Sequence, residues 1–237
     1  MRSPQVIYLD AVGTIFGVRG SVGQQYAKVA IDFGVNLDEQ VINSAFYQNF
    51  QTAPRIAFPH LLQAEIPRAE YEWWRSLAEQ TFSQTGDFVK FADFDQFFKQ
   101  LYDYFASAEP WIIYQDTLVA LDRWRKLGVN LALLSNFDSR IYSVIEALEI
   151  GDYFQSITIS TEVGSAKPDA LIFKTALTKH QLDQLPDQAW HIGDSFSEDY
   201  EGANAVGINA FWLNRDRRPA KNLAQQTAQT IHLLTDL

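Results

Sequence analysis

Polar side chains follow three apolar runs of the sequence, and their types suit the binding of an anion. Asp10, Ser135 and Asp194 each come after such a run, with Asn136 next to Ser135, and Lys167 lies in a loop just before a proline. Two carboxylates can ligate Mg²⁺, which prefers hard oxygen ligands and keeps several of its waters. An amine and a hydroxyl can hold the oxygens of a tetrahedral anion. These residue types together indicate a site for a divalent cation and a phosphate-like group.

The apolar runs that precede these residues have the length and composition of buried strands. Strands are predicted at residues 5–9, 129–134, 154–159, 189–192 and 208–213. Segments of helical character lie at residues 116–127, 139–149 and 168–179, and after Asp194 to about residue 206. This alternation is typical of a parallel sheet covered by helices on both faces. We therefore predict an α/β fold with a Rossmann-like parallel-sheet core.

The position of the polar residues at strand ends favours a ligand-binding site. An Asp after a strand is often only a turn former or a helix cap. In open α/β sheets, however, ligands bind beyond the carboxyl ends of the strands. Because several polar residues recur at such ends, we expect them to converge at one edge of the sheet.

A helical segment interrupts the α/β pattern. Apolar residues recur at helical spacing between the first strand and Pro110, and most of the aromatic excess lies there. We predict an α-helical cap domain of residues 16–110, inserted into a core domain of residues 1–15 and 111–237. The Trp73-Trp74 pair and the phenylalanines that follow are expected to form the core of the cap, with one member able to line a substrate pocket.

Composition and charge exclude several classes of function. The net charge of −10 disfavours nucleic acid and anionic membranes as partners. Zero Cys excludes disulfides, thiolate zinc sites and cysteine nucleophiles, and only 4 His disfavour a histidine-rich metal site. His191, within an apolar run, is expected to be a buried core residue, with a supporting role behind the site as the lesser alternative. The N-terminal apolar run is too short for a signal peptide and no run is long enough to span a membrane, so we expect a cytoplasmic protein.

Four segments resemble the motifs of the haloacid dehalogenase superfamily, in the order in which that superfamily has them. They are Asp10-Ala11-Val12-Gly13-Thr14, Ser135-Asn136, Lys167-Pro168-Asp169, and Gly193-Asp194-Ser195 through Asp199. The insert lies between the first and second motifs, as the helical cap does in the first subclass of the superfamily. The Trp pair and the stretches around the second and fourth motifs resemble most the group of haloacid dehalogenase-like hydrolase domain-containing protein 3.

The resemblance implies a role for each motif residue. Asp10 would be the nucleophile that forms an aspartyl-phosphate, with Lys167 as the second catalytic residue. Mg²⁺ would be held by Asp10, the backbone carbonyl of Val12 and Asp194, with Asp199 in support. The phosphate or substrate would be bound by Gly13, Thr14, Ser135 and Asn136. The implied substrate is a small, anionic, phosphorylated metabolite, and the sequence sets no oligomeric state.

Val12 departs from the pattern of the superfamily's phosphatases. They usually carry there a second Asp that protonates the leaving oxygen and then activates water, and such a general acid/base is worth about 10²–10⁴ in rate. Valine can do neither, although the metal contact at this position uses only the backbone. One hypothesis is a Mg²⁺-dependent phosphatase-like hydrolase whose substrate has a good leaving group, or which uses a proton donor from the cap such as His60.

Two other hypotheses stay open. A haloacid dehalogenase needs no acid for a halide leaving group and no metal, and its first motif is similar. That pattern also implies an early cap arginine, whereas no arginine occurs between Arg19 and Arg55. Asp194 and Asp199 are retained, and a metal-free Asp194 would repel Asp10. The last hypothesis is a non-catalytic module that binds a phosphorylated ligand or a protein.

Overall fold

A six-stranded sheet forms the centre of the computed structural model, which describes residues 3–237. Its order is β5-β4-β1-β6-β7-β8, and every neighbouring pair is parallel. The strands are β1 (Val6–Leu9), β4 (Asn130–Ser135), β5 (Ser156–Ile159), β6 (Ala189–Gly193), β7 (Asn209–Leu213) and β8 (Thr230–Ile231). The first strand of the chain therefore lies inside the sheet, between β4 and β6.

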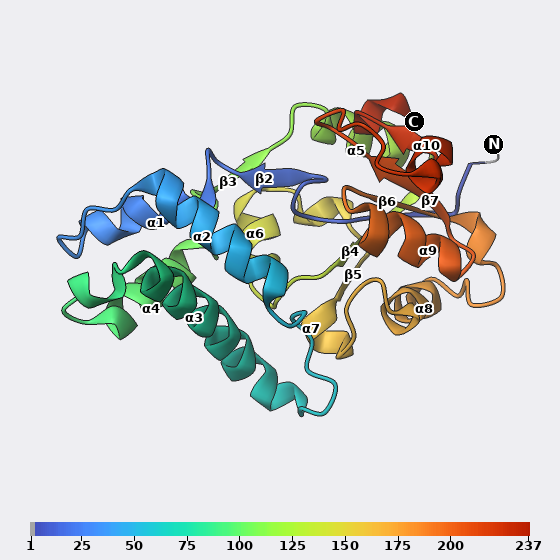
Figure 1. The fold of residues 1–237 in the computed structure, drawn as a ribbon. Coiled ribbons are helices and arrows are strands. Elements are labelled where there is room, and N and C mark those ends of the chain that lie inside the picture. The colour runs from blue at the N-terminus through green and yellow to red at the C-terminus, as the bar shows by residue number, and fades with distance from the viewer. Residues whose placement is uncertain (1–2) are drawn as a thin grey trace.

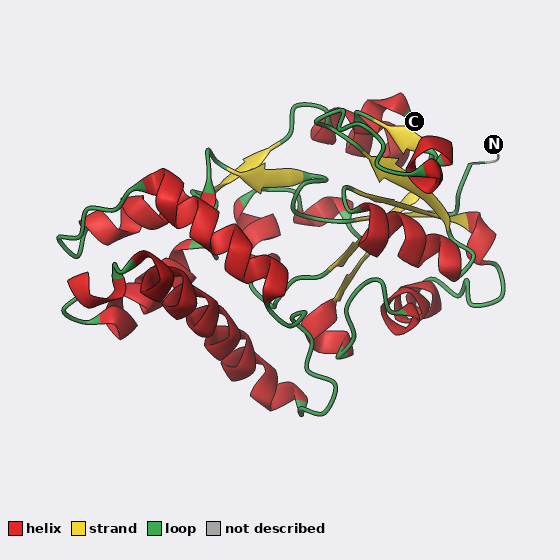
Figure 2. Cartoon of the chain, in the orientation of Figure 1, coloured by secondary structure: helices red, strands yellow, loops and turns green. Residues whose placement is uncertain are grey.

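Helices cover both faces of this sheet, which explains why its strands are apolar throughout. Residues of β1 alternate between two hydrophobic clusters: Ile7 and Leu9 belong to one, Val6 and Tyr8 to the other. The first cluster includes α5 (Thr117–Lys126) and α6 (Ile141–Ala147). The second includes α8 (Ala170–Lys179) and α9 (Gly202–Ala205). Figures 1 and 2 show the resulting layers of helix, sheet and helix.

Four helices lie together beside the sheet, at the left of Figure 1. They are α1 (Val22–Ile31), α2 (Glu39–Thr52), α3 (Ile66–Thr85) and α4 (Phe94–Tyr104). Ser21, Asp38 and Asp93 cap the N-termini of α1, α2 and α4 by accepting backbone N–H bonds. Their apolar faces pack into a third hydrophobic cluster that is rich in phenylalanine. The predicted fold class, a parallel-sheet core with a helical insert, is confirmed.

A two-stranded antiparallel ribbon joins the insert to the sheet region. It pairs β2 (Phe16–Val18) with β3 (Trp111–Ile113). Phe16 and Trp111 belong to the same cluster as β1, so the ribbon is anchored in the core of the sheet. The domain boundaries at 15/16 and 110/111 fall on this ribbon and stay a prediction.

The remaining elements are short. They are α7 (Ser160–Val163), α10 (Leu223–Thr227), a π-helical turn (Phe196–Glu201), and 3-10 turns at Gln63–Glu65, Phe88–Lys90, Gly151–Tyr153, Pro186–Gln188 and Leu234–Asp236. The predicted strands and helices occur with shifts of a few residues, while β2, β3, β8, α7 and α10 were not predicted. Within residues 3–237, no helix is long and apolar enough to cross a membrane.

Candidate active site

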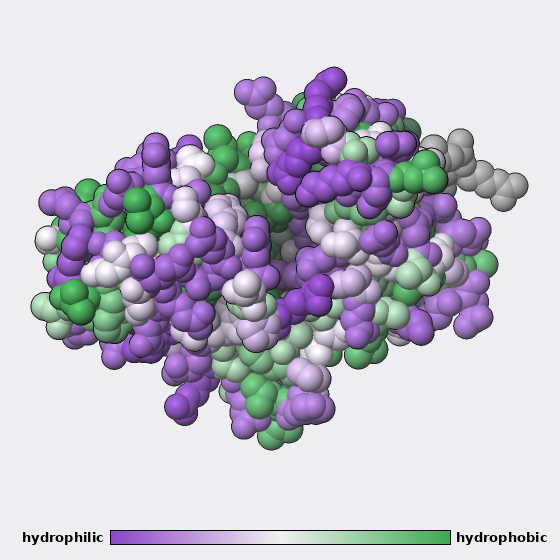
Figure 3. Space-filling view, in the orientation of Figure 1, coloured by the Kyte–Doolittle hydropathy of each residue, from purple (hydrophilic) through white to green (hydrophobic). Residues whose placement is uncertain are grey.

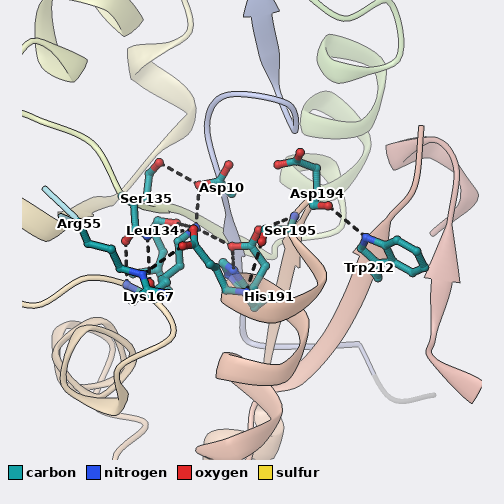
Figure 4. Close-up of polar contacts among 12 residues, drawn as sticks. Asp10, Arg55, Leu134, Ser135, Lys167, His191, Asp194, Ser195 and Trp212 are labelled. Carbon is teal, nitrogen blue, oxygen red and sulfur yellow. Dashed lines mark hydrogen bonds and ion pairs between the residues drawn. The ribbon is translucent and has the colours of Figure 1, made fainter. Parts of the chain in front are cut away.

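Three adjacent strands bring the predicted site residues together. Asp10 follows β1, Ser135 ends β4, and Asp194 follows β6. β1 pairs with β4 on one side and β6 on the other, so these residues meet at the carboxyl ends of the central strands. This is the topological switch point of the sheet, where ligands bind in such folds. Figure 4 shows Asp10, Ser135 and Lys167 gathered, with Asp194 beside them.

Lys167 connects two buried carboxylates. Its Nζ lies 2.6 Å from Asp10 Oδ1 and 2.5 Å from Asp199 Oδ1, and it donates to the Leu134 carbonyl at 3.1 Å. Ser135 Oγ donates to the same oxygen of Asp10 at 2.8 Å. Both side-chain donors to Asp10 thus go to Oδ1, which leaves Oδ2 for a substrate or a cation.

Asn136 holds the backbone of Lys167 in place. Asn136 Nδ2 donates to the Lys167 carbonyl at 3.0 Å, and Asn136 Oδ1 accepts from the Lys167 N–H at 2.7 Å. The same Nδ2 donates to Glu198 Oε2 at 3.1 Å. These contacts position Lys167, whereas the predicted role of Asn136 in binding substrate stays a prediction.

Asp199 is held by three donors. Its Oδ1 receives Lys167 and lies 2.9 Å from His191 Nε2, and its Oδ2 accepts the Ser195 N–H at 3.0 Å. Gly193 makes room for it, since a Cβ there would lie 2.1 Å from Asp199 Cγ. His191 is fully buried, as predicted, and its contact with Asp199 supports the lesser alternative of a role behind the site. Its position in β6, three residues before Asp194, is the signal for this contact.

Burial and mutual repulsion shape the charges of this group. Burial raises the pKa of Asp10, with Lys167 opposing and Asp199 reinforcing the rise. Burial, with the negative charge of Asp10 next, also raises the pKa of Asp194 to about 7. Burial acts against the ammonium of Lys167, but the two carboxylates outweigh it and raise its pKa. For Asp199 burial is outweighed by Lys167 and His191, which hold its pKa well below the usual range.

The three carboxylates can accommodate a metal ion. One oxygen from each of Asp10, Asp194 and Asp199 lies within 4.8 Å of the others. Asp10 and Asp194 disfavour each other's charge, and a cation between them would remove that conflict. Within residues 3–237, no hydrogen bond reaches the Val12 carbonyl, so this oxygen is also available. Hard oxygen donors of this kind suit Mg²⁺, and Asp199, already bonded through both oxygens, fits the supporting role predicted for it.

The turn after Asp10 is fixed by internal bonds. Gly13 has φ +91°, and a Cβ there would lie 2.6 Å from Asp194 Cγ, so the close approach of the turn to Asp194 requires glycine. The Gly13 N–H donates to the Phe16 carbonyl at 2.8 Å, and the Thr14 N–H to the Ala11 carbonyl at 3.2 Å. Both amides are therefore engaged in the turn, and phosphate binding by Gly13 and Thr14 stays a prediction.

A cavity of about 690 Å³ opens beside Val12, between the helical insert and the sheet. Val12 is 36% exposed and lines it, together with Trp73 and Trp74. Figure 3 shows the molecule hollowed between the two regions. His60 is exposed and is not among the lining residues, so the structure does not bring this suggested proton donor to the site.

The cap aromatics divide between core and cavity. Phe94 and Phe97 are buried in the cluster of the insert, as predicted, whereas Phe98 also lines the cavity. Trp73 and Trp74 are only partly buried, so they lie at the edge of that cluster. Trp74 Nε1 donates to Asp138 Oδ2 at 2.7 Å, a contact that was not predicted because the two residues are distant in the chain.

Comparisons with known proteins agree with this fold. The family described as haloacid dehalogenase-like hydrolase matches residues 4–207. Haloacid dehalogenase-like hydrolase domain-containing protein 3 of Bos taurus is 33% identical over 208 residues, covering 85% of this chain and 78% of that protein. It belongs to the group whose motifs this sequence resembles most.

Solved structures with the same fold include different chemistries. A HAD phosphatase from Thermococcus onnurineus has a TM-score of 0.65 at 21% identity, covering 100% of this chain and 95% of its own. A 2-haloacid dehalogenase from Pseudomonas syringae pv. Tomato DC3000 has a TM-score of 0.63 at 16% identity, covering 98% and 96%. At these identities the likeness shows the fold alone, and a choice between the two reactions depends on the site.

Proposed function

The chain belongs to the haloacid dehalogenase-like hydrolases, and on this premise we propose that it hydrolyses a small phosphorylated substrate with Mg²⁺, through a phosphoryl group carried on Asp10. The observation that supports this most is that the carboxylates of Asp10 and Asp194 lie close together, beside the buried Lys167. A hydrolase that displaced halide without a metal would gain nothing from a second carboxylate beside its nucleophile, because burial and the charge of Asp10 raise the pKa of Asp194 to about 7 and no cation would offset them.

Asp10 would act as the nucleophile through Oδ2. Its other oxygen is held by Ser135 and Lys167, which orients the carboxylate. The carboxylate attacks phosphorus, the bond from phosphorus to the leaving oxygen breaks, and that oxygen departs with the electron pair. Water then attacks the acyl phosphate, which releases phosphate and restores Asp10.

Lys167 would stabilise the charge that accumulates on the transferring group. Its ammonium is 1% exposed, and it stays protonated because two carboxylates raise its pKa. In a site that excludes water such a fixed charge acts strongly. Ser135 would contribute a hydroxyl donor, and His191 would position Asp199. Asn136 would position Lys167 and, because it also lines the cavity, would bind substrate as well.

Asp10, Asp194 and the Val12 carbonyl would hold Mg²⁺, with Asp199 in support. When bound, the ion would neutralise part of the negative charge of the phosphoryl oxygens. This local cation explains how a protein of net charge −10 can accept an anion. We expect this substrate to be a small molecule and not nucleic acid, and the protein to act in the cytoplasm.

Turnover of acetyl phosphate tests this proposal. We expect Mg²⁺-dependent phosphate release that EDTA stops and that Asp10→Asn reduces by at least about 10³-fold, as expected for loss of a nucleophile. Asp95→Asn is the matched control, because Asp95 lies on the surface of α4 and, among residues 3–237, forms an ion pair only with Arg75. Phosphate release that is unaffected by EDTA or by Asp10→Asn would contradict the proposal.

Dehalogenation is the second candidate, because Val12 suits a leaving group that needs no proton. Halide release from 2-chloropropionate in the presence of EDTA would support it against the phosphatase. If neither phosphate nor halide is released, the non-catalytic hypothesis replaces both.

A further inference from the structure

The cavity beside Val12 has a composition that phosphate chemistry alone does not explain. Nearly half of the residues that line it are aromatic, and they come mainly from the insert. Phe50 of α2 is 43% exposed and stacks on Trp74 at 6.2 Å and 20°. It also meets Trp73 edge-on at 6.2 Å. A partly exposed aromatic wall of this kind favours a flat apolar ligand.

The charged residues of the lining are already paired. Arg140 makes two bonds to Asp138, at 2.8 and 2.7 Å, and lies 3.9 Å over the ring of Tyr102. Arg55 Nε lies 3.2 Å from Glu198 Oε1 at the edge of the cavity. A second phosphate or a carboxylate on the substrate would have to break one of these pairs. A sugar would leave hydroxyl groups against aromatic rings without partners, which costs free energy.

Val12 limits which leaving groups can depart, and this limit is independent of the aromatic lining of the cavity. It occupies the position of the missing acid and lines the same cavity, so the departing oxygen receives no proton from it. A phenolic oxygen has a pKa of about 10, whereas that of water, comparable to an aliphatic alcohol, is about 15.7. An aryl oxide can therefore depart as the anion, while an alkoxide departs slowly without an acid.

We propose that the substrate is an aryl phosphate monoester, whose ring system occupies the aromatic cavity and whose phosphate reaches Asp10. This assignment rests on the proposed function and specifies its substrate class. The bond between phosphorus and the aryl oxygen breaks as the Asp10 carboxylate bonds to phosphorus. The aryl oxide then takes a proton from water, and a second water releases phosphate from Asp10.

Three phosphorylated compounds, two esters and one acyl phosphate, separate the effect of the ring from that of the leaving group. 1-Naphthyl phosphate has both features, acetyl phosphate has a good leaving group without a ring, and hexyl phosphate has an apolar body with a poor leaving group. With Mg²⁺, we expect kcat/KM for 1-naphthyl phosphate to exceed that for acetyl phosphate by about tenfold, the order expected for stacking of its rings. It should exceed that for hexyl phosphate by about 10²-fold or more, since hexyl phosphate needs the absent acid.

Variants of α2 test the cavity. Phe50→Ala should lower the ratio of kcat/KM for 1-naphthyl phosphate to that for acetyl phosphate by roughly three- to tenfold. Phe50 is partly exposed, so the variant should still fold. Val41→Ala is the control, because Val41 lies on the same helix, is 49% exposed and does not line the cavity. It should leave this ratio unchanged.

Calorimetric titration of the metal-free protein with 1-naphthol gives a readout that needs no turnover. We expect saturable binding that Phe50→Ala weakens and Val41→Ala does not. Equal binding by wild type and Phe50→Ala, or turnover of acetyl phosphate without a preference for 1-naphthyl phosphate, overturns the aryl assignment and leaves the proposed function intact. Absence of turnover of all three phosphorylated compounds overturns the proposed function, and the substrate class with it.

Discussion

Val12 lies between two regions of the candidate site, the sheet side and the insert side, which are held together by different interactions. On the sheet side, the charges of Asp10, Lys167 and Asp199 are buried, and each is bonded to several partners. On the insert side, rings such as Phe50 and Trp73 are partly exposed, and ring packing places them, with one hydrogen bond from Trp73 Nε1 to the Pro54 carbonyl. A buried charge that loses its partner costs far more than a partly exposed ring that loses a neighbour. The sheet side thus tolerates little change, whereas the insert can vary and set the substrate.

Restoring an acid at the boundary between the two sides should have the largest effect. Val12→Asp is expected to raise kcat for hexyl phosphate by about 10²–10⁴-fold, because the new carboxyl can protonate the leaving alkoxide. The effect on 1-naphthyl phosphate should be much smaller. Val12 is 36% exposed, so the added carboxyl is solvated.

Val12→Asn, which is similar in shape to the aspartate variant but cannot transfer the proton, serves as the control. Steady-state kinetics with both esters provide the measurement. An equal gain for both esters would show that the leaving group is not what Val12 limits.

Removing the ammonium group of Lys167 tests whether the sheet side depends on each buried charge having its ion-pair partner. Lys167→Met should lower the free energy of unfolding by about 3–5 kcal/mol at pH 7, because two buried carboxylates lose their partner. Without the ammonium these carboxyls bind protons more tightly when folded, so the deficit should grow as pH rises above their ordinary pKa of 3.8. Urea unfolding across this pH range measures it.

Lys174→Met is the matched control, since Lys174 is exposed on α8. If Lys167→Met lowers the free energy of unfolding by no more than this control does, the sheet side is not more sensitive to change than the insert.

The metal affinity of the sheet side should depend on pH in a defined direction. Burial and Asp10 raise the pKa of Asp194 to about 7, so the metal must displace a proton below that pH. We expect the apparent affinity for Mg²⁺ to fall by up to about tenfold for each pH unit below 7, and to level off above it. Calorimetric titration with MgCl₂ between pH 5.5 and about 8 measures this. Affinity that is constant over the range would contradict a protonated Asp194.

The contact that crosses the mouth of the cavity should matter least. Arg55 and Glu198 are both partly exposed, with side-chain exposures of 59% and 32%. Arg55→Ala is therefore expected to change the free energy of unfolding by less than about 1 kcal/mol, and the change should shrink in high salt. A loss above about 2 kcal/mol in urea unfolding would mean that the insert and the sheet are joined more firmly than this pair suggests.

The sequence predicted the sheet side well because its information is local. An apolar run followed by Asp10 or Asp194 indicates a strand end without knowledge of the partners, and parallel topology then brings the ends together. The same reasoning predicted the burial of His191 but not its contact with Asp199. Such a contact depends on the π-helical turn after Asp194, which has no clear sequence signature.

The cavity could not be predicted, because no local pattern distinguishes a core aromatic from one that lines a void. Phe97 and Phe98 are neighbours in the sequence, yet only Phe98 reaches the cavity. The ribbon of β2 and β3 was missed for a related reason. Each strand has three residues, too few to show a period, and the pairing joins Phe16 to Ile113 across the whole insert.

The central place of β1 has a consequence for the order of folding. Asp10 is synthesised well before Lys167, which follows it by 157 positions. During synthesis β1 has no strand to pair with until β4 emerges, and its second neighbour, β6, comes later still. The helices α1–α4 have a hydrophobic cluster of their own and can form in the interval. Because pairings this distant in sequence form slowly, Asp10 should reach its final environment only after β6 and Asp199 have left the ribosome.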